Sequence, residues 1–201
     1  MRRFTALALL YFVVPAAAWA SSIEIVNKYG SVSISNAGIV SHGSQLVGFN
    51  GIIAGPGHSL GSVAFTTGAL MSGTIFGGGT FAGGSGISSF VVIGKGNWGG
   101  PKGFIFSGYF AGPVKWVLIN KTGANLTFEL RDRVIGQLWN GRVVSFATYQ
   151  TISATTGQLA KGIGHIAGGK TRPVAPEPGT LGLIGTALTG IAGGLWRRAR
   201  R

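Results

Sequence analysis

Apolar and polar residues alternate with a period of two through residues 103–153, and this pattern restricts the fold more than any other feature of the chain. In the stretch 125–131, Leu126, Phe128 and Leu130 are separated by single polar residues. Two neighbouring stretches place three apolar residues each on one face in the same way: Val114, Trp116 and Leu118 in 114–119, and Phe104, Phe106 and Phe110 in 103–110. A period of two is typical of strands with one buried face, so Lys115 and Glu129 are expected on the solvent face.

Turn residues divide this region into strands. Asn140-Gly141 is a pair that favours a two-residue type I′ turn, which would place Ile135 opposite Phe146. A second turn is expected at 121–124, between two of the alternating stretches. Residues 103–153 are therefore predicted to form four or more sequential antiparallel strands.

The rest of the chain between its two ends is rich in glycine and contains short strand-like stretches. The protein has 37 glycines and no cysteine, a composition that suits many turns and excludes disulfides. No stretch of 21–172 has the 3.6-residue periodicity of a convincing amphipathic helix. The short strands expected in this part are residues 22–26, 31–35, 62–67, 73–76 and 88–94.

These patterns predict one all-β domain over residues 21–154, folded as an antiparallel β-sandwich or an open barrel of sequential hairpins. Residues 155–179 are rich in glycine, proline and lysine and are expected to be a linker, with an edge strand in 157–166 as the alternative. The two ends of the chain indicate a signal helix before this domain and a transmembrane helix after it.

The N-terminus has the three parts of a secretory signal peptide. Arg2 and Arg3 provide the positive region, residues 4–14 provide the apolar region, and Ala18 and Ala20 are the small residues of a cleavage site. We therefore expect residues 1–20 to be removed after Ala20, and the general secretion machinery to export the remainder.

The C-terminus contains an apolar segment, residues 180–196, without a charged residue. As a helix it would be about 25 Å long, which is the short limit for a transmembrane helix. Small residues recur at every fourth position and give either a face for a partner helix or a glycine-rich segment without a partner: Gly182, Thr186, Gly190 and Gly194. The arginines of 197–201 are placed in the cytoplasm by the positive-inside rule: Arg197, Arg198, Arg200 and Arg201.

Pro176-Glu177-Pro178 precedes the apolar segment, and the order of tripeptide, short apolar helix and terminal arginines resembles the PEP-CTERM sorting tail of exported proteins of Gram-negative bacteria. The resemblance covers about the last 26 residues and the general plan of the precursor. It implies that an exosortase recognises Pro176, Glu177 and Pro178 and cleaves near them. The passenger would then pass from a transient stay in the inner membrane to the cell surface or the exterior. The family is also associated with exopolysaccharide production and biofilm formation.

The formal net charge of +13 does not indicate nucleic-acid binding, because much of it lies at the two ends that are predicted to be processed. Residues 21–172 contain only three acids: Glu24, Glu129 and Asp132. The last two are three positions apart on a strand-like stretch and would point to opposite faces, so they do not indicate the carboxylate pair of a hydrolase. The histidines lack the spacing of a ready metal site: His42, His58 and His165. No catalytic residue, metal or other cofactor is therefore expected.

Lys95, Trp98 and Lys102 lie in the glycine-rich stretch 94–104 and would present an aromatic ring beside two cations if Trp98 faces solvent. Such a loop suits contact with an acidic exopolysaccharide, whereas an inward-packed Trp98 would make the stretch an ordinary turn. The sequence favours a secreted, non-catalytic protein of the cell surface or extracellular matrix. A polysaccharide-binding module is the alternative, and an exported hydrolase is less favoured.

Overall fold

The computed structural model describes residues 23–84 and 89–174. These residues form antiparallel strands and one short helix, α2 (Thr156–Ala160). The strands are β1 (Ile25–Lys28), β2 (Ser31–Ser35), β3 (Gly38–His42), β4 (Ser44–Phe49), β5 (Ile52–Ile53), β6 (Gly61–Phe65), β7 (Leu70–Thr74), β8 (Gly78–Phe81), β9 (Phe90–Lys95), β10 (Lys102–Phe110), β11 (Val114–Thr122), β12 (Asn125–Leu138), β13 (Val143–Thr155) and β14 (Ile163–Pro173). Across 23–84 and 89–174, no helix is long and apolar enough to cross a membrane.

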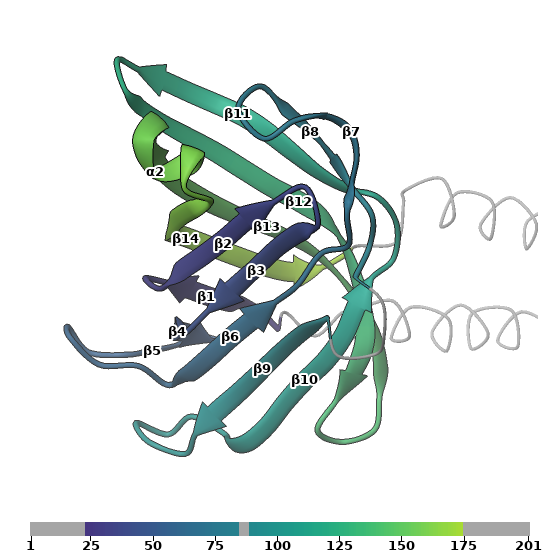
Figure 1. Cartoon of the computed structure of the whole chain (residues 1–201). Helices are drawn as coiled ribbons and strands as arrows, with labels where there is room; N and C mark the ends of the chain where they lie inside the picture. The colour runs from purple at the N-terminus through teal and green to yellow at the C-terminus, as the bar shows by residue number, and fades with distance from the viewer. Residues whose placement is uncertain (1–22, 85–88, 175–201) are drawn as a thin grey trace, which may run out of the picture.

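Eight of the strands close into a barrel (Figure 1). Their order around the ring is β1, β4, β6, β9, β10, β12, β13 and β14, and the pairing of β14 with β1 closes it. The prediction of an all-β antiparallel fold is confirmed. Of its two alternatives the barrel is right and the sandwich is wrong, and the ring is closed rather than open. The predicted flanking helices lie outside the described residues.

Aromatic side chains fill the barrel, because a ring of eight strands is just wide enough for side chains to occupy its interior. Four fully buried phenylalanines come from four of its strands: Phe65, Phe90, Phe106 and Phe146. The ring centroids of Phe106 and Phe146 lie 5.2 Å apart in an edge-to-face arrangement. The three apolar residues predicted on one face of 125–131 are buried in the same core.

The structure corrects the linker expected over 155–179. Thr155 caps α2 with a capping box, and β14 then continues to Pro173. β14 pairs with β13 on one side and with β1 and β2 on the other, so it is not an edge strand either. Gly169 is a place of close packing, because a Cβ there would overlap the side chains of Asn27 and Gln150. The domain therefore continues through β14 instead of ending at residue 154.

The hairpin between β12 and β13 has a different turn from the predicted type I′. Of the two turn residues only Gly141 has a positive φ, 80°, and its N–H donates to the carbonyl oxygen of Leu138 at 2.9 Å. The three-residue loop that results is a type I turn followed by glycine in the left-handed region. It shifts the register by one residue, so that Val134 rather than Ile135 lies opposite Phe146.

Phe104 does not share a buried face with Phe106 and Phe110, contrary to the prediction. A β-bulge between Phe104 and Phe106 changes the register of β10 against β9 and leaves Phe104 45% exposed. The turn expected at 121–124 is present, because Thr122 pairs with Asn125.

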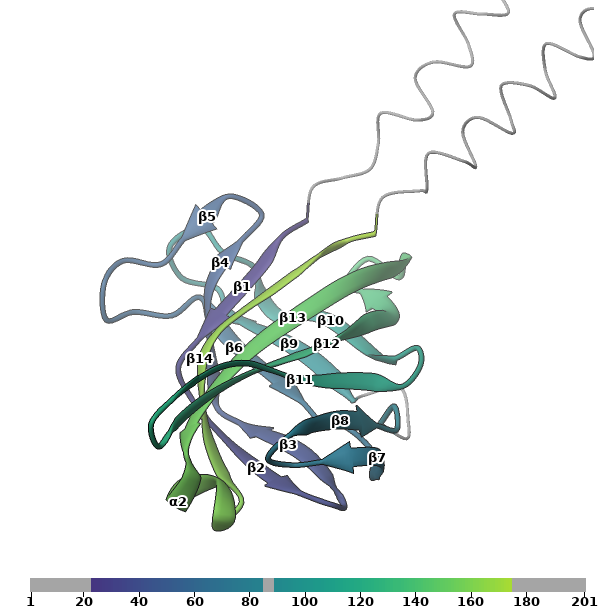
Figure 2. The same ribbon diagram turned by 90° about the horizontal axis from the view of Figure 1, so that it is seen from above.

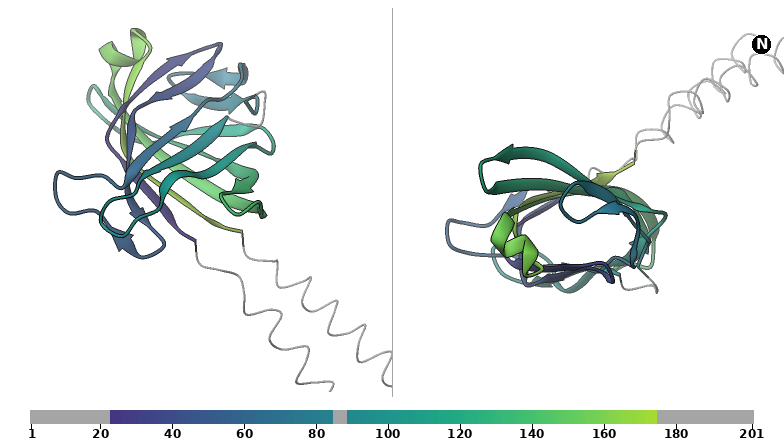
Figure 3. Two further views of the ribbon diagram at one scale, coloured as in Figure 1. Left: turned by 90° about the horizontal axis from the view of Figure 1, so that it is seen from below. Right: turned by 45° about the horizontal axis from the view of Figure 1, so that its top comes forward.

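The first and last described residues lie side by side at one end of the barrel (Figure 2). Ile25 pairs with Thr171, and the N–H of Asn50 donates to the carbonyl oxygen of Glu24 at 2.9 Å. Three connections lie at this same end: 50–60 after β4, 96–101 between β9 and β10, and 138–142 between β12 and β13 (Figure 3). We call residues 23–24 and 174 together with these three loops the exit end.

Candidate functional site

Lys95, Trp98 and Lys102 meet at the tip of the β9–β10 hairpin, as predicted. Lys95 lies directly opposite Lys102, and the chain then turns through 96–101. Trp98 is 58% exposed, so its side chain faces solvent and does not pack inward. Its φ of 55° lies in the left-handed region, which costs a residue with a Cβ about 1–2 kcal/mol. The tip therefore holds an exposed indole in a strained conformation beside two cations.

The 50–60 loop supports this tip. The imidazole of His58 lies against the Trp98 indole, with 5.1 Å between ring centroids. Lys95 Nζ donates to Ser59 Oγ at 2.7 Å, and Asn97 Nδ2 donates to the carbonyl oxygen of Ser59 at 3.1 Å. His58 thus contacts the indole and the bonds to Ser59 hold the hairpin tip on the 50–60 loop, while much of the Trp98 side chain stays exposed.

A second cationic surface, which the sequence analysis missed, crosses the outside of β11, β12, β13 and β14. Lys115, Arg131, Tyr149 and Lys170 form one row across these strands, each opposite the next. Neighbouring strands are about 4.8 Å apart, so cations lie on both sides of the Tyr149 ring. Tyr149 is 45% exposed. We call this row the Tyr149 face.

Two hollows flank the Tyr149 ring. One, of about 370 Å³, includes three cations and one carboxylate: Lys28, Lys170, Arg172 and Glu129. The other, of about 400 Å³, also includes three cations and one carboxylate: Lys115, Arg131, Arg133 and Asp132. A surface with an excess of cations around an exposed aromatic ring suits an anionic ligand that also offers a face for stacking.

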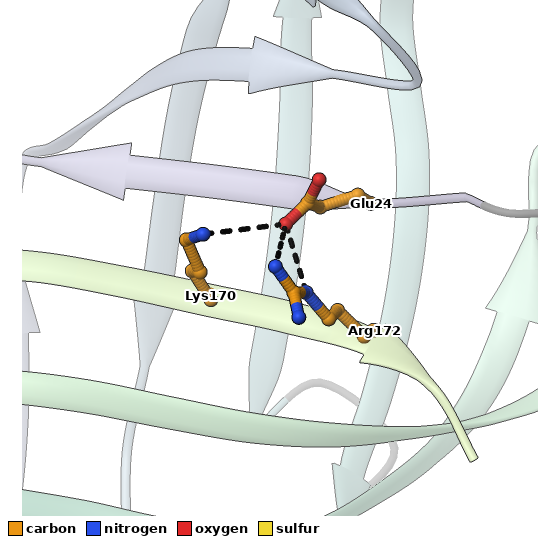
Figure 4. A network of polar contacts seen from close by, with 3 residues as sticks. All are labelled: Glu24, Lys170 and Arg172. Atoms are coloured by element: carbon orange, nitrogen blue, oxygen red, sulfur yellow. Dashed lines mark hydrogen bonds and ion pairs between the residues drawn. The ribbon is translucent and has the colours of Figure 1, made fainter. Parts of the chain in front are cut away.

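Glu24 links the two chain ends beside the first hollow (Figure 4). Its Oε1 accepts a hydrogen bond from Nε of Arg172 at 2.8 Å, and it forms ion pairs with Nη2 of Arg172 at 2.8 Å and with Lys170 Nζ at 3.7 Å. The hydrogen bond from Arg172, with the charges of both cations, holds the pKa of Glu24 below its ordinary value. Glu24 thereby pairs with Lys170 of the Tyr149 face and with Arg172 beside it.

The other two acids of the barrel have partners of their own. Glu129 Oε1 lies 3.5 Å from Arg131 Nη1. Asp132 Oδ2 accepts a hydrogen bond from the N–H of Gly112 at 3.2 Å, and its partial burial raises the pKa of the carboxyl above its ordinary value. The two carboxylates line different hollows, so they do not converge on one cleft as an acid–base pair would.

The three histidines of the barrel are separated from one another. His42 Nε2 lies 3.0 Å from Ser33 Oγ, and His165 Nε2 lies 3.3 Å from Gln158 Nε2. His58 contacts Trp98 at the exit end. Over 23–84 and 89–174, no three side chains of His, Cys, Asp or Glu are grouped so that they could hold a metal ion.

The remaining candidate residues lie outside the described residues: Ala18, Ala20, Pro176, Glu177, Pro178, Gly182, Thr186, Gly190, Gly194 and the arginines of 197–201. Comparisons with protein-family models, with curated proteins and with solved structures gave no match. The case for function therefore depends on the order of segments in the sequence and on the two surfaces of the barrel.

Proposed function

We propose that the protein is an exported, non-catalytic component of the cell surface or extracellular polysaccharide matrix, sorted by a PEP-CTERM tail. The observation that carries this proposal is the order of segments in the chain: signal peptide, β domain, Pro-Glu-Pro, apolar segment and terminal arginines. The adjacent ends of the barrel support it, because a leader and an anchor that leave side by side hold the domain on one side of a membrane.

In this proposal the tail is a temporary anchor and an address. The signal peptide exports the barrel, and residues 180–196 hold it at the inner membrane with the arginines of 197–201 in the cytoplasm. An exosortase then cleaves near Pro176-Glu177-Pro178. Residues 175–179 alone separate the barrel from the apolar segment, so the tripeptide lies within reach of an enzyme embedded in the membrane.

Replacement of Pro176, Glu177 and Pro178 by alanine tests the sorting step. We expect the variant to stay in the membrane fraction at its uncleaved length, while the wild type is shortened and found outside the inner membrane. Pro56→Ala, which changes a proline in the 50–60 loop, is the control and should be processed normally. Normal shortening and release of the triple variant would contradict recognition of this tripeptide.

Binding of an acidic polysaccharide is the second candidate function, and the Tyr149 face supports it. Sugar rings stack on aromatic side chains, and carboxylate groups on the polymer would pair with cations of the two hollows. Lys28, Lys115 and Arg133 make none of the ion pairs found within 23–84 and 89–174, so they are available to a ligand. The Trp98 tip is the weaker polysaccharide site, because it lies where the chain ends leave the barrel.

Binding of the full-length chain in a mild nonionic detergent to polygalacturonate, with neutral dextran as the comparison polymer, tests this second function. We expect Tyr149→Ala combined with Lys115→Gln and Arg133→Gln to weaken binding about tenfold or more, the scale of one charge-assisted hydrogen bond. Lys121→Gln with Lys161→Gln is the matched control at the far end of the barrel. Equal binding to both polymers, or equal loss in the control, would contradict the assignment.

A further inference from the structure

The exit end carries both exposed tryptophans of the described residues. Trp98 is 58% exposed and Trp139 is 52% exposed, whereas Trp116 is buried in the core. The neighbouring 50–60 loop presents Ile53, which is 79% exposed, and Val143 directly after the 138–142 loop is 69% exposed. Each of the three loops of the exit end therefore has a large apolar side chain in or next to it that faces solvent.

Trp139 and Trp98 belong to neighbouring parts of one end and not to opposite sides of the molecule. The Trp139 ring lies 6.1 Å from that of Phe49, the residue that pairs with Ile25 where the chain enters the barrel. The Trp98 tip is held on Ser59 of the 50–60 loop, and that loop begins at Asn50, which bonds to Glu24. Loops 50–60, 96–101 and 138–142 thus lie at the end of the barrel from which both chain ends leave.

Cations flank the 96–101 loop and end the 138–142 loop. Lys95 and Lys102 are exposed at the base of the Trp98 tip, and Arg142 is exposed beside Trp139. Residues 50–60, 96–101 and 138–142 contain no Asp or Glu. Exposed tryptophans next to Lys and Arg are typical of protein surfaces in the headgroup region of a bilayer.

The connection between the barrel and the apolar segment is short. Residues 175–179 separate Val174 from the apolar segment and span at most about 17 Å when fully extended. If 180–196 crosses a membrane, the exit end cannot leave the neighbourhood of its surface. The loops with Trp98, Trp139 and Ile53 then face the lipid, and the Tyr149 face is on the side of the barrel.

We infer that the exit end binds the surface of the bilayer from which the tail emerges, with the Trp98 and Trp139 indoles and Ile53 in the interface and Lys95, Lys102 and Arg142 on anionic headgroups. The inference depends on the proposed anchoring by 180–196. It goes beyond that proposal because a flexible tether would hold the barrel near the membrane with no preferred end. Docking would hold the Pro-Glu-Pro tripeptide at a fixed height above the bilayer. Because the contact of the exit end with lipid is weak by itself, cleavage of the tail would release the barrel from the membrane.

The test measures lipid contact of single tryptophans in the full-length chain, reconstituted into vesicles that contain phosphatidylglycerol brominated near the headgroup. We expect Trp98→Phe and Trp139→Phe each to remove part of the bromine-quenched fluorescence. Both residues are exposed, so the variants should keep the fold, which the melting temperature checks. Quenching of Trp196 in the same vesicles reports insertion of the tail.

Two results would overturn the inference, and they can be told apart. Unchanged quenching in Trp98→Phe and Trp139→Phe, with loss in Trp196→Phe, would show an inserted tail and a barrel that does not touch lipid. If alkaline carbonate extracts the wild type from the vesicles, the proposed anchoring by 180–196 is contradicted, and the docking that depends on it is contradicted as well.

A charge comparison completes the test. Lys95→Gln with Lys102→Gln should reduce the docked fraction on anionic vesicles, because each cation at such a surface contributes about fivefold in affinity. Lys121→Gln with Lys161→Gln, exposed lysines away from the exit end, should leave it unchanged. Equal effects of the two pairs would contradict docking by one end.

Discussion

Glu24 and Arg172 join the first and last strands of the barrel by a hydrogen bond from Nε and an ion-pair contact of Nη2, each of 2.8 Å, where both ends of the chain leave it. The residues on the two strands also pair through their backbones, with Ile25 opposite Thr171. The side-chain bridge therefore reinforces the pairing that closes the ring. It also partly compensates the charges of Lys170 and Arg172 near the end of β14.

Replacing Glu24 by glutamine should lower the melting temperature at pH 7. The pKa of Glu24 is lowered in the folded protein, so the ionised carboxylate stabilises the fold above about pH 4.5, its ordinary pKa, and this contribution is lost as pH falls through the lowered pKa. Thermal unfolding of wild type and Glu24→Gln from pH 7 to about pH 3 should show a difference that disappears at the acid end. Glu129→Gln, with a longer contact of 3.5 Å to Arg131, is the control with a smaller effect. A difference that does not change with pH would contradict the ion-pair explanation.

Replacing Asp132 by asparagine should stabilise the fold at pH 7, the opposite of the effect expected for Glu24→Gln. Burial raises the pKa of Asp132, so the fold prefers the protonated carboxyl, and this preference costs stability as pH rises above about 3.8, the ordinary pKa. Asparagine keeps an oxygen that can accept from the N–H of Gly112 and carries no charge. We expect a gain of a few tenths of a kcal/mol at pH 7, small because the group is partly solvated, and no gain at about pH 3. Urea unfolding at the two pH values measures it, and a loss of stability at pH 7 would contradict it.

Replacing Gly61 by alanine should destabilise the barrel strongly. Gly61 lies on β6 opposite Gly94 of β9, and a Cβ there would overlap the carbonyl oxygen of Ile93. We expect a loss of about 2 kcal/mol or more in the free energy of unfolding, because the two strands must move apart. Gly157→Ala is the matched control: no atom lies within 4 Å of the added Cβ, and the change should be neutral or stabilising by up to about 1 kcal/mol. Equal effects of the two substitutions would show that β6 and β9 are not packed this closely.

Replacing Gln150 by leucine should break a polar network inside the barrel. Asn27 Nδ2 donates to Gln150 Oε1 at 2.8 Å and to Ser44 Oγ at 2.7 Å, and Gln150 Nε2 donates to Thr148 Oγ1 at 3.1 Å. All four side chains are fully buried, so leucine leaves buried polar groups without a partner, at a cost of about 1–3 kcal/mol. Gln45→Leu, on the exposed face of β4, is the control. Unchanged stability of Gln150→Leu would show that the network contributes nothing.

Local patterns in the sequence were enough to predict the strands of 103–153 and the all-β class. β12 buries Leu126, Phe128 and Leu130 as its alternation predicts, and β2 covers the predicted 31–35. The expected strand 73–76 is wrong, because β7 ends at Thr74 and the chain turns there. The strands β3 and β4 were not anticipated. Alternation marks which face of a strand is buried, but it does not reveal which strands pair.

Closure of the ring could not be predicted, because β1 and β14 come from opposite ends of the domain. Glycines at 164, 168 and 169 interrupt the alternation of β14 and made it resemble a linker. The packing role of Gly164 and Gly169 depends on the side chains of other strands: the Cβ missing from Gly169 leaves room for those of Asn27 and Gln150.

The difference between local patterns and contacts of distant strands also explains which surfaces could be predicted from the sequence. Lys95, Trp98 and Lys102 are close in sequence, and one hairpin brings them together. The Tyr149 face draws single residues from four strands, and its existence depends on the register that sets Arg131 opposite Tyr149 and Tyr149 opposite Lys170. The four residues are visible in the sequence, but the strand pairing that brings them together as one surface is not.

The most direct test of the proposed export and sorting is the intact mass of the protein recovered from the exterior of the cells that make it. We predict a chain that begins at Ser21 and has lost its C-terminus near Pro178. A surface-exposed protein that still ends at Arg201 would contradict processing of the tail and would make residues 180–196 a permanent anchor.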